Sequence, residues 1–310
     1  MKLSVVIPAY NEEKNIAFTL DELLATIDVF GDIKQTEIIV IDDHSADSTF
    51  NVVSAFAGKG VRCIRLSRRC GSHTALRAGT KEATGDAVLF ISADGQDDPA
   101  CLKNMLDKWR KGAKIVWALR KNRNDEPWHI RKTAKLFYKL LNWINGDRVD
   151  TIDLSRAGFY LLDREVVNAI NSCLEKNTSL FGLITWLGFS HNFVEYERRQ
   201  RKHGKSKWNF RRRLRLALDW IVAFSGLPLK IMSLIGIIVA SFGFLYAIFI
   251  IIMAVKGRPA TGWASMMVVI LVLGGTQMIM LGIIGEYLWR NIEESRNRPL
   301  YFIEKDSSKS

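Results

Sequence analysis

The chain has 310 residues, a formal net charge of +12 and an ordinary hydrophobic fraction of 48%, which allows one large domain with an appendage or two modest domains. Much of the positive charge lies in residues 198–215, where ten Lys and Arg occur without an acidic residue. This basic segment directly precedes an apolar one, so it is expected to attract anionic lipid head groups, and nucleic-acid binding is the less favoured alternative. The four cysteines show no CxxC spacing, and neither a disulfide framework nor a metal role is indicated.

Strand-like and helix-like segments alternate through the first 120 residues. Short apolar runs predict strands at residues 3–7, 37–41, 62–66, 87–91 and 114–118. Helices are predicted from an N-cap at Asn11 to about residue 29, at residues 48–57 and 72–82, and from Pro99 onward. Buried strands separated by such helices indicate βαβ units and a mainly parallel sheet, in which ligands bind beyond the carboxyl ends of the strands.

The pattern changes after residue 120. A helix is predicted at residues 128–145, and further strands at residues 159–162 and 193–196. Residues 211–227 mix arginines with Leu214, Leu218 and Trp220. A basic helix with such apolar residues suits a membrane interface, and an ordinary packed helix is the alternative.

Two segments, 231–255 and 263–285, contain no charged residue. Both exceed the ~20 residues needed to cross a hydrocarbon core of ~30 Å, so two transmembrane helices are predicted in preference to two buried core helices. Lys and Arg precede the first span and recur after the second, whereas the loop between them holds only Lys256 and Arg258. The positive-inside rule therefore predicts a hairpin with both ends in the cytoplasm. The N-terminus shows no cleavable signal, in agreement with this orientation.

Polar residues gather where three predicted strands end, at residues 8–13, 42–48 and 92–99. One such group alone is a weak signal, because Asp and Ser commonly cap helices. Three groups in one sheet are harder to explain by capping. Asp94 and Gln96 can both face a hard divalent ion, since Mg²⁺ or Mn²⁺ takes a few protein oxygens and completes its shell from phosphates and water. A diphosphate bound with its metal is therefore predicted.

These motifs resemble glycosyltransferase family 2. The resemblance is carried by residues 5–13, by the Asp-Asp-x-Ser motif at residues 42–45, and by Thr-Gly-Asp-Ala at residues 84–87 leading into Asp94 and Gln96. Lys-Trp-Asn at residues 207–209, the two spans, Gly-Glu-Tyr-Leu at residues 285–288 and Arg-Pro-Leu-Tyr at residues 298–301 are similar to the polyprenyl-phosphate glycosyltransferase branch. That branch includes bactoprenol glucosyltransferases and dolichol-phosphate mannose synthases.

The resemblance implies a GT-A-like α/β fold with a mainly parallel sheet and flanking helices, followed by an amphipathic interface helix and a two-span hairpin. It implies inverting, metal-assisted transfer, with Mg²⁺ or Mn²⁺, from a nucleotide diphosphate-sugar to a polyprenyl phosphate such as undecaprenyl phosphate. UDP is favoured over GDP. The expected setting is the bacterial inner membrane and cell-surface glycan or lipopolysaccharide modification, with assembly as a homo-oligomer, a tetramer in some relatives.

The resemblance also implies domain limits and roles for single residues. The expected limits are residues 1–197 for a cytoplasmic catalytic domain, 198–228 for the basic segment and interface helix, 229–290 for the spans and 291–310 for a cytoplasmic tail. The nucleotide is expected at Pro8, Tyr10, Glu12, Asp42, Asp43 and Asp94, and the metal at Asp94 and Gln96. The acceptor phosphate is expected at Arg198, Arg201 and Lys207, and the catalytic residues are Asp94, Arg201 and Lys207.

Several positions depart from the family pattern. Ser92 stands where relatives have the first Asp of Asp-x-Asp, and Gly158 and Tyr160 stand in a motif that usually reads Gly-Asp-Phe-Arg. The loop at residues 69–73 reads Arg-Cys-Gly-Ser-His in place of the usual Asn-x-Gly-Lys. A degenerate, non-catalytic membrane protein that binds the nucleotide-sugar or organises a partner is therefore the alternative, although a phosphate acceptor needs no general base.

Overall fold

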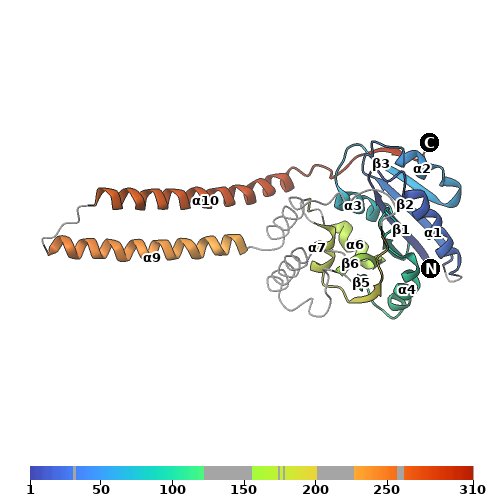
Figure 1. Ribbon diagram of the computed structural model, residues 1–310, viewed down its shortest axis with the longest axis horizontal. Coiled ribbons are helices and arrows are strands. Elements are labelled where there is room, and N and C mark those ends of the chain that lie inside the picture. Colours follow the sequence, from blue (N-terminus) through green and yellow to red (C-terminus); the bar gives the residue numbers. More distant parts are fainter. Residues whose placement is uncertain are drawn as a thin grey trace. The chain divides into compact units, whose positions relative to one another are not determined.

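The computed structural model describes residues 1–30, 33–121, 156–173, 175–176, 179–200, 227–256 and 262–309. The chain divides into two compact units, residues 1–216 with 299–310 and residues 217–298. The first unit is a sheet with helices, and the second contains two long apolar helices (Figure 1). The predicted helix at residues 128–145 and the predicted interface helix up to residue 226 lie outside the described residues.

The sheet contains eight strands in the order β7-β5-β6-β4-β1-β2-β3-β8. The strands are β1 (Lys2–Ala9), β2 (Gln35–Asp42), β3 (Val61–Leu66), β4 (Ala87–Phe90), β5 (Ile115–Arg120), β6 (Ala157–Asp163), β7 (His191–Tyr196) and β8 (Ile303–Asp306). β1 pairs in parallel with both β2 and β4, β2 with β3, and β5 with β7. β6 is antiparallel to β4 and β5, and β8 is antiparallel to β3. The mainly parallel sheet predicted from the sequence is confirmed.

Helices cover both faces of this sheet. They are α1 (Ile16–Asp28), α2 (Thr49–Ser54), α3 (Ser72–Glu82), α4 (Leu102–Arg110), α6 (Arg164–Ser172) and α7 (Leu180–Trp186), with 3-10 turns η1 (Ala57–Lys59) and η2 (Pro99–Cys101). One buried cluster joins α1, α2 and α4 to one face of the sheet, and a second joins α3, α6 and α7 to the other. Successive residues of β1 alternate between the clusters, because neighbouring side chains of a strand point to opposite faces.

Some local predictions need correction. The first helix begins at Ile16 and its N-cap position is Asn15, so Asn11 does not cap it. Asn11 instead adopts a left-handed conformation with φ of 51° and belongs to the turn after β1. The second helix is shorter than predicted, since α2 ends at Ser54 and a 3-10 turn follows. The sequence analysis assigned no element to the tail, whereas β8 extends the sheet beyond β3.

The second unit holds α9 (Leu227–Val255) and α10 (Trp263–Ser295). They run antiparallel side by side, and a Cβ placed on Gly236 of α9 would lie 3.4 Å from Met280 of α10 (Figure 1). Residues 228–253 and 266–295 are long and apolar enough to cross a membrane. Their apolar side chains are mostly exposed, for example Phe242 at 70% and Leu245 at 62%. Such a surface is unfavourable in water, where apolar area prefers to be buried.

The close approach of α3 to β1 gives a test of the fold. A Cβ on Gly79 would lie 2.2 Å from Cγ1 of Val6 on the buried face of β1. We expect Gly79→Ala to lower the free energy of unfolding by about 1–3 kcal/mol, because overpacking forces side chains or backbone to move. Gly58→Ala is the matched control, since nothing lies within 4 Å of its Cβ position. Equal melting temperatures for the two variants in thermal denaturation would contradict this packing.

Candidate active site

The three polar segments predicted to lie together do so, because β4, β1 and β2 are neighbours and run parallel. Their carboxyl ends therefore meet at one edge of the sheet. The segments that follow are residues 10–15 after β1, 43–48 after β2 and 91–98 after β4. The turn after β3 at residues 67–71 and the segment after β7 at residues 197–200 lie at the same edge. These five segments form the candidate active site.

The first two segments are held together by reciprocal hydrogen bonds. The Asn11 backbone N–H donates to Ser45 Oγ at 2.9 Å, and the Ala46 N–H donates to Asn11 Oδ1 at 2.8 Å. The Glu13 N–H donates to Asp47 and the Ser48 N–H donates back to Glu13. Both turns are thereby fixed relative to each other before any ligand binds. This rigidity suits a ligand-binding edge, since a preorganised site costs less entropy on binding.

Glu12 and Tyr10 were predicted to flank a nucleotide. Glu12 is buried, and its carboxylate accepts a hydrogen bond from the Asn15 side chain at 2.7 Å, so it helps shape the start of α1. Tyr10 is partly exposed, and the Arg69 guanidinium lies 3.9 Å from the centre of its ring. This distance is typical of a cation–π contact. The sequence analysis mentioned Arg69 only as part of a divergent loop.

Asp43 links the second segment to the turn after β3. Its two carboxylate oxygens accept hydrogen bonds from the Cys70 N–H at 2.6 Å and the Gly71 N–H at 2.8 Å. Burial raises the pKa of Asp43, and the two amides and the Arg69 charge oppose that rise. His73 follows at the start of α3. Both its ring nitrogens are buried and have no hydrogen-bond partner among the residues that the structure describes. Burial lowers the pKa of His73, which favours the neutral imidazole.

Asp94 lies in a short polar chain with Ser92, Asp97 and Tyr196. Ser92 Oγ is 2.9 Å from Asp94 Oδ1 and 2.5 Å from Asp97 Oδ2, so its single proton serves one carboxylate at a time. The Tyr196 hydroxyl, at the end of β7, donates to Asp97 Oδ1 at 2.8 Å. Burial and the Asp97 charge raise the pKa of Tyr196, which stays a neutral donor. Asp97 and Tyr196 were not singled out from the sequence.

Gln96 and Arg198, predicted for the metal and the acceptor phosphate, are brought into contact. The Arg198 guanidinium donates to Gln96 Oε1 at 2.5 Å. The Gln96 side-chain amide donates to the Arg199 carbonyl at 3.2 Å, and the Arg199 N–H donates to the Gln96 carbonyl. Arg199 itself is paired with Glu22 and Asp98. Arg198 is therefore positioned by the loop that carries Asp94. Arg201 and Lys207 lie outside the described residues.

The residues present fit one divalent cation bound together with a diphosphate. Within the described ranges, no group of three or more His, Cys, Asp or Glu side chains is arranged to hold a metal. Asp94 uses Oδ1 for Ser92 and the Gln96 N–H, and its other oxygen makes no hydrogen bond to a described residue. Mg²⁺ needs only one or two protein carboxylates when phosphates and water complete its shell. Such a site is expected to fill only when the diphosphate is present.

The packing around Gly158 on β6 leaves no room for the aspartate that the family resemblance predicts at this position. A Cβ at this position would lie 1.9 Å from the Tyr196 hydroxyl oxygen, so no side chain fits while Tyr196 holds Asp97. Tyr160, two residues on, is buried and stacks against Phe90 with ring centroids 4.9 Å apart. Both departures from the family motif therefore belong to the packing of β6 against its neighbours.

The parallel core with helices on both faces, carrying carboxylates beyond its strand ends, is the architecture of the GT-A glycosyltransferases. Among solved structures, the chain is similar to mannosyl-3-phosphoglycerate synthase from Rubrobacter xylanophilus, with a TM-score of 0.53, 21% identity and coverage of 71% of this chain and 72% of that one. It is also similar to glucosyl-3-phosphoglycerate synthase from Mycobacterium tuberculosis in complex with Mn²⁺, uridine-diphosphate and phosphoglyceric acid, with a TM-score of 0.51, 19% identity and coverage of 71% and 76%. At these identities the likeness concerns the fold.

Sequence relatives narrow the class. Residues 4–166 match Glycosyl transferase family 2. The bactoprenol glucosyl transferase of Shigella phage SfV is 38% identical over 100% of both chains, and the prophage bactoprenol glucosyl transferase homolog of Escherichia coli K12 is 37% identical over 98% of this chain and 99% of that one. An uncharacterized glycosyltransferase of Synechocystis is 40% identical over 98% and 95%. The chain belongs to glycosyltransferase family 2, and it is a glycosyltransferase.

The position of Ser92 allows a test of the metal site. Ser92→Asp would place a third carboxylate beside Asp94 and Asp97, and like charges ~4 Å apart repel by up to about 4 kcal/mol at an effective dielectric constant near 20. We expect a lower melting temperature without divalent ions. With a nucleoside diphosphate present throughout, we expect a larger rise on adding Mn²⁺ than in the unsubstituted protein. Ser92→Asn is the control, because asparagine has nearly the size of aspartate and carries no charge. A Mn²⁺-induced rise in Ser92→Asp no larger than in the control would show that these carboxylates do not face a common cation.

Gly158 gives a second prediction. We expect Gly158→Ala to cost about 1–3 kcal/mol of stability, because the Tyr196 ring must move and release Asp97. Tyr196→Phe, which removes only the hydroxyl, is expected to cost less. Chemical denaturation of both variants measures the difference. A Gly158→Ala variant as stable as the unsubstituted protein would be inconsistent with the close approach.

Proposed function

We propose that this glycosyltransferase moves a sugar, with inversion, from a nucleotide diphosphate-sugar to a polyprenyl phosphate such as undecaprenyl phosphate. UDP is the favoured nucleotide, and the product serves cell-surface glycan or lipopolysaccharide modification. The observation that carries the acceptor is the 38% identity to a bactoprenol glucosyl transferase over the whole of both chains, including the two apolar helices. UDP is favoured because the fold neighbour from Mycobacterium tuberculosis binds it together with Mn²⁺.

The donor fits the edge formed by β1, β2 and β4. Tyr10 with the overlying Arg69 offers a flat cationic surface to a base, and Asp94 lies in the segment that follows the neighbouring strand β4. When a divalent ion is bound, it would neutralise charge that develops on the leaving diphosphate. Asp94 holds an oxygen ready for that ion, and Ser92 and Gln96 fix the carboxylate through hydrogen bonds to its other oxygen.

The acceptor removes the need for a general base. A phosphate monoester has a second pKa near ~6, so the attacking oxygen is already anionic at neutral pH. The chain then has to position that oxygen and balance its charge. Arg198 is held beside Gln96 on the loop that carries Asp94, which suits a phosphate approaching the donor sugar. Arg201 and Lys207 remain predicted partners of the same phosphate. The absence of a carboxylate at Gly158 is compatible with this chemistry.

Membrane topology follows from the same proposal. α9 and α10 would cross the bacterial inner membrane as a hairpin, with both ends of the chain in the cytoplasm. β8 supports the hairpin, because a segment that follows the second span pairs with β3 of the sheet that precedes the first. An odd number of crossings would place these two strands on opposite sides. Assembly as a homo-oligomer, a tetramer by analogy with relatives, stays a prediction.

A transfer assay tests the proposed reaction. The full chain in membranes or detergent receives radiolabelled UDP- and GDP-sugars, undecaprenyl phosphate and Mn²⁺ or Mg²⁺, and label in the organic phase is counted. We expect transfer from at least one UDP-sugar, and a fall of about 100-fold or more in Asp94→Asn, since loss of a single electrostatic contact of this kind costs 10²–10³ in rate.

Asp21→Asn is the matched control. This exposed carboxylate on α1 pairs with Lys59 at the surface and with no other described residue, so its substitution should leave the rate unchanged. The anomeric configuration of the product, read by NMR, tests inversion. No transfer across the whole donor panel, with nucleotide binding retained, would overturn the proposal in favour of the non-catalytic alternative.

A further inference from the structure

The C-terminal strand β8 is anchored firmly at its far end. Arg62 on β3 donates two hydrogen bonds to Asp306, at 3.0 and 2.6 Å, and the Asp306 side chain is only 5% exposed. This pairing holds the pKa of Asp306 well below its usual range. The Cys63 N–H donates to Ser307 Oγ, and the Ser307 N–H donates to the Cys63 carbonyl. These contacts account for the attachment of β8 without Glu304.

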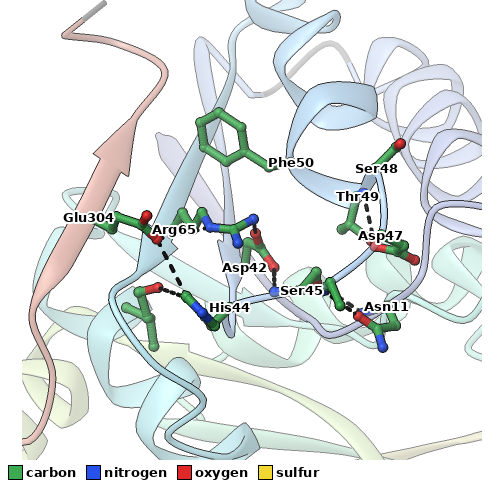
Figure 2. A network of polar contacts seen from close by, with 12 residues as sticks. Asn11, Asp42, His44, Ser45, Asp47, Ser48, Thr49, Phe50, Arg65 and Glu304 are labelled. Carbon is green, nitrogen blue, oxygen red and sulfur yellow. Dashed lines mark hydrogen bonds and ion pairs between the residues drawn. The ribbon is translucent and has the colours of Figure 1, made fainter.

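Glu304, two residues earlier, faces a different partner. Its Oε2 accepts from Arg65 Nε at 3.0 Å and lies 3.4 Å from His44 Nδ1 (Figure 2). The Nδ1 of His44 is also 3.1 Å from the Leu66 carbonyl oxygen, which can only accept, so this nitrogen carries the proton. The Arg65 contact lowers the pKa of Glu304, which is therefore ionised at neutral pH. Glu304 thus joins β3 to the turn after β2.

The contact continues inward to a buried carboxylate. Arg65 NH1 lies 3.1 Å from Oδ2 of Asp42, which is 0% exposed. The other oxygen of Asp42 accepts the Ser45 N–H at 2.9 Å and closes the turn at residues 42–45. A buried carboxylate needs a cation and hydrogen bonds to offset its desolvation. Arg65 supplies this cation. The Nε of the same guanidinium donates to Glu304, which fixes the orientation of the Arg65 side chain.

The turn that depends on these contacts is conformationally costly. His44 has a φ of 58°, and a non-glycine residue in the left-handed region costs roughly 1–2 kcal/mol. Such a residue persists where surrounding contacts enforce it. Asp42, Ser45 and Glu304 supply those contacts on both sides of His44. The same turn carries Asp43, whose carboxylate fixes the loop that holds Arg69 over Tyr10.

We propose that Glu304 is a positioning residue for the donor nucleotide, acting through Arg65 and Asp42 on the turn at residues 42–45. This inference rests on the proposed function, because it takes the edge beside β2 as the nucleotide site. A residue beyond both apolar helices in the sequence thereby completes a site built from the first 100 residues. Glu304 touches neither the nucleotide nor the reacting atoms.

Nucleotide affinity tests the proposal directly. Calorimetry on the full chain in detergent, with Mn²⁺, measures UDP and GDP binding to the unsubstituted protein, Glu304→Ala and Glu304→Gln. We expect Glu304→Ala to weaken binding of the preferred nucleotide about tenfold. This loss corresponds to part of the free energy of one charged hydrogen bond, because Glu304 acts on the nucleotide only through the turn. Glu304→Gln, which still accepts a hydrogen bond from Arg65, should recover part of the loss.

Lys305→Ala is the matched control on the same strand. The Lys305 Nζ lies 6.0 Å from the centre of the Phe50 ring and makes no hydrogen bond to Arg65, and the backbone pairing of Lys305 with Arg65 does not depend on its side chain. It should stay within about twofold of the unsubstituted protein, well below the tenfold step that corresponds to 1.4 kcal/mol. In the transfer assay, Glu304→Ala should raise the KM for the nucleotide-sugar and leave kcat and the KM for the lipid unchanged. A merely structural defect would lower the active fraction, and hence kcat, without this selective rise.

The outcomes are distinguishable. Equal nucleotide affinity in Glu304→Ala and the unsubstituted protein overturns the positioning role and leaves the proposed function intact. An equal loss in Lys305→Ala and Glu304→Ala also overturns it, because the effect would then belong to the strand as a whole. If the unsubstituted protein binds neither UDP nor GDP, the proposed function fails and the inference fails with it.

Discussion

The parallel pairing of β1 with both β2 and β4 determines where every polar group of the site lies. The central apolar residues of these strands are buried on both faces and form the core. The candidate functional groups lie at the carboxyl ends of the strands, as Asp42 does, or in the segments that follow, and the parallel direction places all three ends at one edge. Reciprocal bonds between the first two segments then fix them against each other. Rigidity at this edge comes from backbone N–H groups that donate to side-chain oxygens of the facing segment, so it depends on the side chains of Asn11 and Ser45.

Ser92 stands where the family resemblance predicts a carboxylate, and two carboxylates nearby, Asp94 and Asp97, accept the hydrogen bonds of this site. Ser92 contributes one proton to two carboxylates, and Tyr196 contributes a second to Asp97. Both oxygens of Asp97 therefore accept hydrogen bonds, whereas Asp94 keeps one oxygen that makes no hydrogen bond to a described residue. This division leaves a single carboxylate oriented toward the proposed diphosphate. A phosphate acceptor tolerates such an arrangement because it brings its own negative charge to the reaction.

The strands and the three polar segments were predictable from the sequence, because short apolar runs and the turns after them are local signals. β8 was not predictable, because its four residues are mostly polar and exposed. Its pairing with β3 joins segments far apart in the sequence and leaves no local signal. The side-chain partners of Gln96 and Gly158 were equally hidden. Arg198 and Tyr196 lie about 100 and 40 residues away in sequence from them, and no local pattern records such contacts. Metal ligands and phosphate ligands were predicted separately, yet Gln96 and Arg198 are in contact.

The pairing of Arg62 with Asp306 joins residues 244 positions apart, with both apolar helices between them. During synthesis at ~5–20 residues per second, roughly 10–50 s separate the appearance of β3 from that of β8. Throughout this interval β3 is an edge strand with unpaired backbone groups, which invites pairing with other chains. The newly made sheet is therefore open to such pairing until β8 has been synthesised. Because Glu304 follows both apolar helices in the sequence, the proposed positioning of the donor would be complete only in chains in which these helices have already been made.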